Sequence, residues 1–421
     1  MKNPVLCIVG LGYVGLPLAH IFAKKGYTVY GYDLNAERIR TLQKGEDWTR
    51  ELSPEQLKSV TIRYSADPAV IREADIVILA IPTPIDEKNN PYLEPVESAS
   101  RTVGKHMKKG AIIVYESTVW PGTTEEICGP ILEKESGMKC GTDFKLGYSP
   151  ERVNPGDKQH TIEKIKKIVS GQDAETLDVL ADLYGSVIEA GIHRAANIKV
   201  AEMAKAIENA QRDLNIAFIN EIALLCHKVG IETKDVIDAA ATKWNFLKFL
   251  PGLVGGHCIG VDPYYLVEKA RQLGMETQVI TAGRALNDSM SRHIAEQIAT
   301  SLRGCVSPRV LVLGLTFKEN IPDTRNSKSG DVVKHLTQLG CTVEVHDPYM
   351  TVETMAKKGW ESGSLAAGPY DAIVLLVPHR EYMGSLSALT QALKPKGLLY
   401  DLKSLLSREE IERDGMKYMA L

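Results

Sequence analysis

The chain lacks the features that mark nucleic-acid-binding and membrane-surface proteins. Its 421 residues hold no long block of lysine or arginine, and the formal net charge is −3 at pH 7. Neither a nucleic acid nor an anionic membrane is therefore indicated as a partner. No low-complexity segment is present, and the 44% hydrophobic and 24% charged residues are ordinary for a globular protein. The length predicts two or three domains.

Cysteine is scarce and shows no paired spacing. The seven cysteines include no C-x-x-C motif and their number is odd, so neither a disulfide framework nor a close metal or redox pair is indicated. We expect reduced thiols and a cytoplasmic location. His257 directly precedes Cys258, but no second pair of ligand-type residues accompanies them, so no bound metal is expected. The cysteines are Cys7, Cys128, Cys140, Cys226, Cys258, Cys305 and Cys341.

Long hydrophobic runs are also rare. The run from Val5 to Ala23 follows a lysine and resembles a signal peptide or membrane span at first sight. Three glycines, Pro17 and His20 interrupt it, and no small-residue cleavage site follows. The run therefore predicts a strand, a tight turn and a helix.

The rhythm of the elements predicts an α/β fold. Short apolar strands alternate with helices in residues 1–195 and again in residues 303–421, which is typical of parallel sheets with helices on both faces. Residues 196–302 are predicted to be mainly helical, and they begin with a helix much longer than average. The predicted fold is two Rossmann-like parallel-sheet domains joined by a long central helix and a helical dimerisation core, and we expect a homodimer.

A glycine-rich turn follows the first predicted strand. Gly10, Gly12 and Gly15 form G-x-G-x-x-G, in which the glycines permit a tight turn, approach of a pyrophosphate and close helix packing. Asp33 ends the next strand, about twenty residues later, where a carboxylate suits the ribose hydroxyls of NAD. Arg38 is nearby and would favour NADP, but Asp33 lies closer to the diagnostic position. The pattern predicts an NAD site.

Further motifs resemble one family, the UDP-glucose/GDP-mannose dehydrogenases. In chain order they are "GLGYVGLPLA", "ESTVWPGTT", "YSPERVNPGD", "AEMAKAIENA", "GGHCIGVD" and "LTFKENIPDTRNS", and they cover nearly the whole chain. The stretch "KWNFLKFLPGLVGGHCIGVDPYYL" is most similar to the branch that oxidises UDP-N-acetylhexosamines, with UDP-GlcNAc favoured. That branch supplies uronic acids for capsules and other surface polysaccharides. The resemblance implies oxidation of a primary alcohol to a carboxylate with two NAD molecules.

The resemblance also implies catalytic roles. The aldehyde must become an adduct that can lose a second hydride, and a thiolate attack by Cys258 provides this adduct. Lys205 and Asn209 lie four residues apart, hence on one helix face, and a cation and an amide donor suit an oxyanion. From spacing alone, a solvated polar stripe with Glu202, Arg212 and Asp213 is equally compatible. The implied catalytic residues are Cys258, Lys205, Asn209, Asp262, Glu151 and Thr118.

Binding residues are implied in the same way. Fixed cations such as Lys318 and Arg325 fit diphosphates. The residues that the resemblance implies for cofactor binding are Gly10, Gly12, Tyr13, Val14, Gly15, Asp33, Arg38, Pro82, Thr83, Thr118 and Arg325. For the UDP-sugar they are Glu151, Arg152, Val153, Lys205, Asn209, Phe246, Lys248, Gly255 and Lys318.

The chain departs from its relatives at several positions, including Arg152, which replaces an aromatic residue of the UDP-glucose branch. Pro155 stands where a second glutamate follows Glu151, so the division of acid–base roles stays open. Leu250 and Thr242 stand where arginines occur in relatives, so their roles are not transferred.

Other functions remain as alternatives. UDP-ManNAc or UDP-glucose is an alternative substrate. A two-electron hydroxyacid dehydrogenase of the 6-phosphogluconate type would share the turn and the long helix but need no cysteine. A nucleotide-binding module without turnover would bind both ligands and form no NADH.

Overall fold

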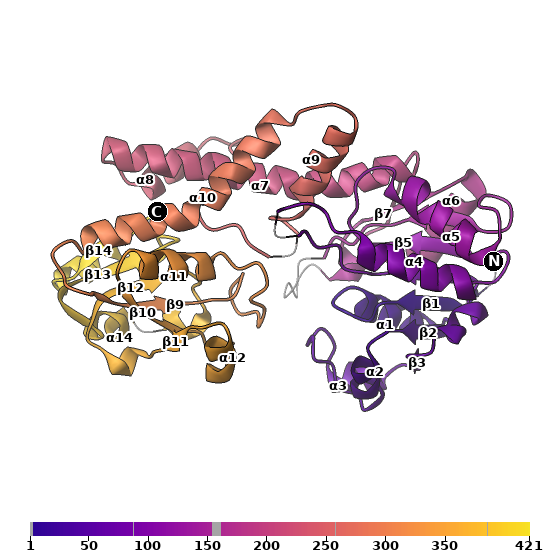
Figure 1. Ribbon diagram of the computed structural model, residues 1–421, viewed down its shortest axis with the longest axis horizontal. Helices are drawn as coiled ribbons and strands as arrows, with labels where there is room; N and C mark the ends of the chain where they lie inside the picture. The colour runs from indigo at the N-terminus through magenta and orange to yellow at the C-terminus, as the bar shows by residue number, and fades with distance from the viewer. Residues whose placement is uncertain (1–2, 87, 154–160, 257, 385) are drawn as a thin grey trace. The chain divides into compact units, whose positions relative to one another are not determined.

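The computed structural model describes residues 3–86, 88–153, 161–256, 258–384 and 386–421 (Figure 1). These residues form two compact units. The first unit comprises residues 1–208 and 264–275, and the second comprises residues 209–263 and 276–421. The three domain ranges expected from the sequence stay a prediction.

The first unit is built on an eight-stranded sheet with the order β3-β2-β1-β4-β5-β6-β7-β8. Neighbouring strands are parallel except β6 and β7, which are antiparallel. The first six strands follow the Rossmann order 3-2-1-4-5-6, in which nucleotides bind where the strand order reverses. The strands are β1 (Leu6–Val9), β2 (Val29–Tyr32), β3 (Ile62–Ser65), β4 (Ile76–Leu79), β5 (Ile112–Tyr115), β6 (Lys145–Tyr148), β7 (Lys167–Gly171) and β8 (Ile192–Arg194).

Helices connect these strands and cover the sheet (Figure 1). They are α1 (Gly15–Lys25), α2 (Ala36–Gln43), α3 (Pro54–Lys58), α4 (Glu94–His106), α5 (Gly129–Ser136) and α6 (Ala174–Gly185), with 3-10 turns η1 (Pro68–Glu73) and η3 (Ile162–Lys164) and the π-helical turn η2 (Thr123–Cys128).

The second unit repeats the same strand order on a smaller scale. Its six-stranded sheet runs β11-β10-β9-β12-β13-β14, and the recorded pairs are parallel. Counted from its own first strand, this is again 3-2-1-4-5-6. The strands are β9 (Arg309–Leu313), β10 (Thr342–His346), β11 (Glu361–Ser362), β12 (Tyr370–Leu375), β13 (Leu393–Asp401) and β14 (Lys417–Ala420).

The helices that lie wholly in the second unit include one long helix, α10. They are α8 (Thr233–Ala240), α10 (Gln278–Ser301), α11 (Ser329–Gln338), α12 (Val352–Lys357), α13 (Arg380–Met383), α14 (Leu386–Gln391) and α15 (Arg408–Arg413), with the 3-10 turn η4 (Leu365–Ala367).

The apolar runs of the sequence form the cores of the sheets. Strands β1, β4 and β5 are buried at every residue, as expected for central strands covered on both faces. The predicted fold class is therefore confirmed: two largely parallel Rossmann-type sheets and a long helix.

That long helix is α7 (Ile198–Val229), with 32 residues, and α9 (Asp262–Gln272) follows the cysteine loop. A stripe of apolar side chains on α7 is open to solvent in the single chain. Its members are Val200, Met203, Ile207, Phe218, Leu225 and Val229, each between 43% and 61% exposed.

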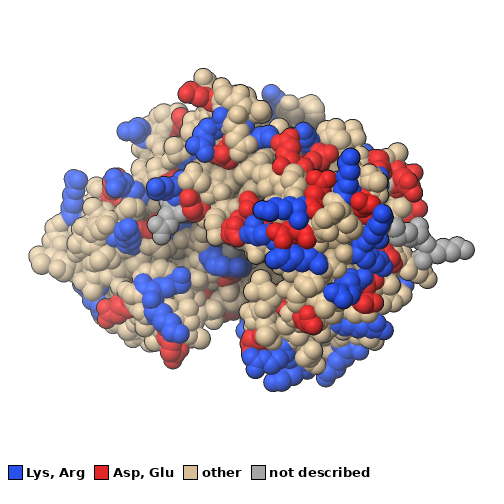
Figure 2. All heavy atoms as spheres, turned by 45° about the vertical axis from the view of Figure 1, so that its right-hand side comes forward, with Lys and Arg blue, Asp and Glu red and all other residues tan. Residues whose placement is uncertain are grey.

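Two surface properties bear on partners. Acidic and basic side chains are intermingled on the face shown in Figure 2. In the described part of the chain, no helix combines the length and hydrophobicity needed to cross a bilayer.

Candidate active site

The glycine turn after β1 has the geometry that a dinucleotide requires. Gly10 has φ +89°, and a Cβ there would lie 2.7 Å from the Ala80 carbonyl oxygen. A Cβ on Gly15 would lie 1.9 Å from the Gly10 carbonyl oxygen, so the first turn of α1 packs directly against the loop. A Cβ on Gly12 would meet no protein atom within 4 Å, so the main chain there is open to a ligand. The arrangement fits a pyrophosphate at the N-terminus of α1. Tyr13 and Val14 complete the turn and are half-buried.

Asp33 is held at the end of β2 beside this turn. Its Oδ2 accepts the Leu11 N–H at 2.8 Å and its Oδ1 accepts the Asn35 N–H at 2.9 Å. These bonds fix the orientation of a half-buried carboxylate at the position expected for ribose recognition.

Arg38 has a different environment from the one expected of a cofactor ligand. The residue is 2% exposed, its Nε donates to the Leu11 carbonyl at 2.8 Å, and its guanidinium pairs with Asp47 at 2.8 Å. The guanidinium thus braces the glycine turn from inside the protein, which leaves little of it for a ligand.

The loops after β4 and β5 are tied together. Ser117 Oγ donates to the Ile81 carbonyl at 2.7 Å and accepts the Ile81 N–H. This link sets exposed Pro82 and half-buried Thr83 beside the loop that carries half-buried Thr118. The three residues expected at the cofactor therefore share one edge of the sheet.

The loop after β6 holds Glu151 by its own main chain. The Oε1 of Glu151 accepts the N–H groups of Arg152 and Val153 at 2.6 and 2.5 Å. Arg152 forms a two-point ion pair with Glu208 of α7, at 3.1 and 2.7 Å. A substrate phosphate or sugar would have to compete with this carboxylate for Arg152.

Lys205 lies on α7, one turn after the buried carboxylate of Glu202. Glu202 accepts the Gly122 and Thr124 N–H groups at 2.5 and 2.9 Å, and burial raises the pKa of its carboxyl to about 7. Lys205 is 7% exposed and has no ion-pair partner among the described residues. Since Glu202 and Asp213 are fully buried, the solvated polar stripe considered above is wrong for these two.

The cysteine loop connects three of the predicted catalytic residues. Asn209 Nδ2 donates to Asp262 Oδ2 at 2.5 Å, and the Asp262 N–H donates to the Cys258 carbonyl at 2.8 Å. The side chain of Cys258 is exposed. Asn209, Cys258 and Asp262 are thus brought together where the loop enters α9.

The glycines that precede the cysteine serve close packing. A Cβ on Gly255 would lie 2.6 Å from the Asn326 carbonyl oxygen, and a Cβ on Gly256 would lie 2.7 Å from the Phe317 ring. Asn326 also donates from Nδ2 to the Gly256 carbonyl at 3.3 Å. The two glycines let the cysteine loop lie against the loop that follows β9.

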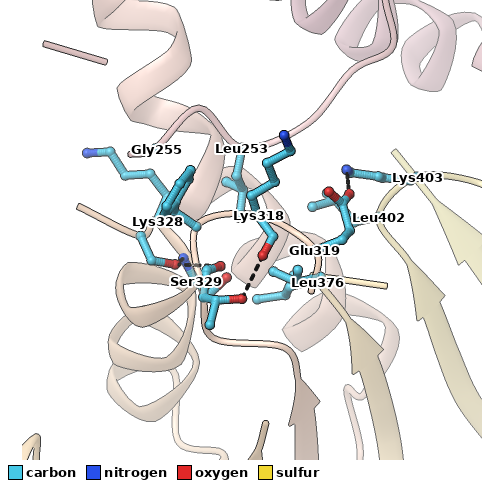
Figure 3. A pocket seen from close by; sticks show the side chains of 13 residues that line it. Leu253, Gly255, Lys318, Glu319, Lys328, Ser329, Leu376, Leu402 and Lys403 are labelled. Atoms are coloured by element: carbon cyan, nitrogen blue, oxygen red, sulfur yellow. Dashed lines mark hydrogen bonds and ion pairs between the residues drawn. The ribbon is translucent and has the colours of Figure 1, made fainter. Parts of the chain in front are cut away.

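A pocket in the second unit lies at its own strand-order reversal (Figure 3). Its walls come from the loops after β9, β12 and β13 and from the cysteine loop. Gly314 repeats the role of Gly10, with φ +86° and a would-be Cβ 2.5 Å from the Val377 carbonyl oxygen. The lining residues are Leu253, Gly255, Thr316, Phe317, Lys318, Glu319, Ser327, Lys328, Ser329, Leu376, Val377, Leu402 and Lys403.

This pocket collects cations that suit a diphosphate. Lys318, Lys328 and Lys403 line it, and Lys403 pairs with Glu319. Arg325 lies outside the lining, where its guanidinium pairs with Asp323 at 2.6 Å. The predicted Lys318 therefore lines this pocket, together with two lysines that the sequence motifs do not indicate.

The loop after α8 carries the remaining predicted contacts. Phe246 is half-buried, Lys248 pairs with Asp238 at 2.6 Å, and Thr242 and Leu250 are exposed. His257 and Pro155 lie outside the described residues.

Sequence reasoning missed two buried charges near Glu151. Glu116, directly after β5, and Lys167, the first residue of β7, pair at 2.7 Å and are 2% and 3% exposed. The available signal was a glutamate at the end of an otherwise apolar strand, in "IIVYES".

Comparisons with known proteins agree with this geometry. Residues 5–188, 199–289 and 311–408 match the NAD binding, central and UDP binding domains of the UDP-glucose/GDP-mannose dehydrogenase family. The chain is 47% identical to a UDP-N-acetyl-D-glucosamine 6-dehydrogenase of Pseudomonas aeruginosa over 97% of this chain and 99% of that protein. It is also 47% identical to protein CapL of Staphylococcus aureus over 97% and 98% of the two chains.

A solved structure shows the same architecture. The structure of a UDP-D-ManNAc dehydrogenase from Pyrococcus horikoshii gives a TM-score of 0.87 at 29% identity, over 99% of this chain and 98% of that chain. With three domains matched in order and relatives at 47% identity, the chain belongs to the UDP-glucose/GDP-mannose dehydrogenase family.

Proposed function

We propose that the protein oxidises the 6-hydroxyl of UDP-GlcNAc to the carboxylate, giving the uronic acid for a surface polysaccharide. The observation that carries the choice of sugar is the 47% identity, over nearly the whole of both chains, to the UDP-N-acetyl-D-glucosamine 6-dehydrogenase of Pseudomonas aeruginosa. The exposed side chain of Cys258, whose main-chain carbonyl accepts the Asp262 N–H, supports a reaction that proceeds past the aldehyde.

The chain's own residues account for the chemistry as follows. NAD, when bound, supplies a hydride acceptor, and two molecules are consumed for each sugar. The Cys258 thiolate adds to the aldehyde carbon to give a thiohemiacetal, whose oxyanion suits the Lys205 ammonium and the Asn209 amide. Loss of the second hydride leaves a thioester. Water activated by Glu151 then cleaves the thioester, which releases the carboxylate and restores the thiol.

The first test is the stoichiometry. With saturating NAD, we expect two NADH and one uronic acid for each UDP-GlcNAc consumed, measured by absorbance and by mass spectrometry of the product. UDP-GalNAc, UDP-ManNAc and UDP-glucose serve as matched substrates. A higher kcat/KM with one of these would reassign the sugar, and one NADH per sugar would contradict the four-electron reaction.

A homodimer through α7 is part of the proposal. The exposed apolar stripe runs along one face of that helix from Val200 to Val229 in the described chain, with a polar interruption between Ile207 and Phe218, so a second copy of the same helix is the occupant we infer. We expect sedimentation to give twice the chain mass, and Phe218→Glu to shift the protein toward monomer. Val306, which is 95% exposed and lies in the bend before β9 rather than on α7, provides the control, because Val306→Glu should leave the mass unchanged. A monomeric wild type would refute the dimer.

We also infer a cytoplasmic location, because a nucleophilic thiol must stay reduced.

A further inference from the structure

We propose that Lys167 is a positioning residue for Glu151, fixing the direction of its carboxylate through a buried ion pair with Glu116. The inference rests on the proposed acid–base role of Glu151 and adds two residues to that machinery.

The sheet topology brings the three residues together. β7 runs antiparallel to β6, and Tyr148 pairs with Ser170. Continuing this register by three residues in each direction places Lys167 opposite Glu151. Because β5 and β6 are parallel, Glu116 reaches the same edge, and the Glu151 N–H donates to the Glu116 carbonyl at 3.4 Å.

The side chains form a short charged chain. Lys167 Nζ lies 2.7 Å from Glu116 Oε2 and 3.6 Å from Glu151 Oε2. The Tyr184 hydroxyl donates to the other Glu116 oxygen at 2.5 Å, and the Lys167 ammonium lies 5.5 Å from the centre of the Tyr184 ring. Every polar atom of the Glu116 carboxylate is therefore engaged, so this pair is a fixed part of the protein.

Of the three charged side chains, Glu151 is the one with a carboxylate oxygen that is not held by a hydrogen bond among the described residues. Its Oε1 is held by two main-chain N–H groups, while its Oε2 accepts no hydrogen bond among the described residues. The ammonium of Lys167 is the nearest charge to that oxygen that the structure records. An opposite charge at this distance attracts the carboxylate and restricts the direction in which Oε2 can face a water molecule.

The other charged side chains recorded near Glu151 are either carboxylates, which repel it, or cations that are already paired. Burial and the nearby charges of Asp47 and Glu151 raise the pKa of Glu51 to about 7, and burial raises the pKa of Glu116. Arg152 is neutralised by Glu208. Among the residues that the structure describes here, Lys167 is thus the cation that lies between Glu151 and Glu116.

The test compares kcat and KM with protein stability. In Lys167→Met we expect kcat at neutral pH to fall about tenfold or more, because a misdirected carboxylate activates water less well. KM for NAD should change less than twofold. Lys167→Arg should restore most of kcat, because it keeps the cation.

Two double variants separate positioning from folding. Lys167→Met leaves Glu116 buried and unpaired, so that variant is expected to lose stability, whereas Lys167→Met with Glu116→Gln removes both charges. We expect the second variant to regain Tm while kcat stays low. Recovery of kcat together with Tm would show that the pair is only structural and would overturn the proposal. In a Glu151→Gln background, Lys167→Met should lower kcat less than twofold further, and a full additional loss would equally overturn it.

A readout without turnover distinguishes this inference from the proposed function. The carboxylate of Glu151 can be followed by infrared spectroscopy at neutral pH, as the difference between wild type and Glu151→Gln. In Lys167→Met the carboxylate stretching band should shift, because the neighbouring cation is lost, and in Lys167→Arg it should stay near its wild-type position. If the wild type oxidises none of the four UDP-sugars, the proposed function fails, while an unchanged band in Lys167→Met refutes the role of Lys167 in either case.

Discussion

Replacing Cys258 by alanine is expected to abolish the second oxidation and to lower kcat by on the order of 10⁴-fold, with NADH limited to one per sugar. The reason is chemical: without a thiol, the aldehyde forms no adduct from which a hydride can leave to give a thioester. Because the side chain is exposed, its removal should leave Tm nearly unchanged. Steady-state kinetics with UDP-GlcNAc and NAD, together with product analysis, measure the loss.

The other cysteines show why the effect should be confined to this position. Burial raises the pKa of the Cys7 and Cys128 thiols to about 12, and it also raises the pKa of Cys140 and Cys341. Cys305 is exposed like Cys258, but it lies in the turn after α10.

Cys305 therefore provides the matched control. Cys305→Ala should keep full activity, and iodoacetamide should inactivate the wild type and Cys305→Ala at the same rate. Two NADH per sugar from Cys258→Ala would show that the second oxidation needs no thioester, and the gem-diol route would then have to be considered.

Local signals in the sequence were sufficient for the fold and for the cofactor turn. Gly10, Gly12, Gly15 and Asp33 are identified by short spacings, and the strand–helix rhythm predicts two Rossmann-type sheets. The structure confirms the two sheets, because the apolar runs and the turns that separate them are recognisable within short windows of the sequence.

The burial of charged residues by partners that are distant in the sequence could not be predicted from such local patterns. Glu116 and Lys167 are 51 residues apart, and Glu202 meets its main-chain donors 78 and 80 residues away. A helix pattern places polar residues toward solvent by default, and this default is wrong for Glu202 and Asp213, since both are buried and Asp213 pairs with Arg284 at 2.6 Å. Arg38 was selected for its position in the sequence, whereas its guanidinium is turned inward toward Asp47.

Two alanine substitutions in the glycine turn are expected to separate cofactor binding from folding. Gly12→Ala adds a methyl group where no protein atom lies within 4 Å, so Tm should not change. The same methyl group would occupy the approach of the pyrophosphate, and KM for NAD should rise about tenfold or more. Thermal melting and NAD titration of the variants measure the two effects.

Gly15→Ala should affect both properties. Its methyl group would lie 1.9 Å from the Gly10 carbonyl oxygen and 3.2 Å from the Ala80 side chain, and because the nearest atom is main chain, the turn itself must shift. We expect a loss of about 1–3 kcal/mol in the free energy of unfolding, with NAD binding lost as the turn opens. Gly185→Ala in α6 meets only Ile192 at 3.6 Å and should change neither property. An unaltered KM in Gly12→Ala would mean that the pyrophosphate does not approach at Gly12, because the open space at that position is the feature that assigns the cofactor to this turn.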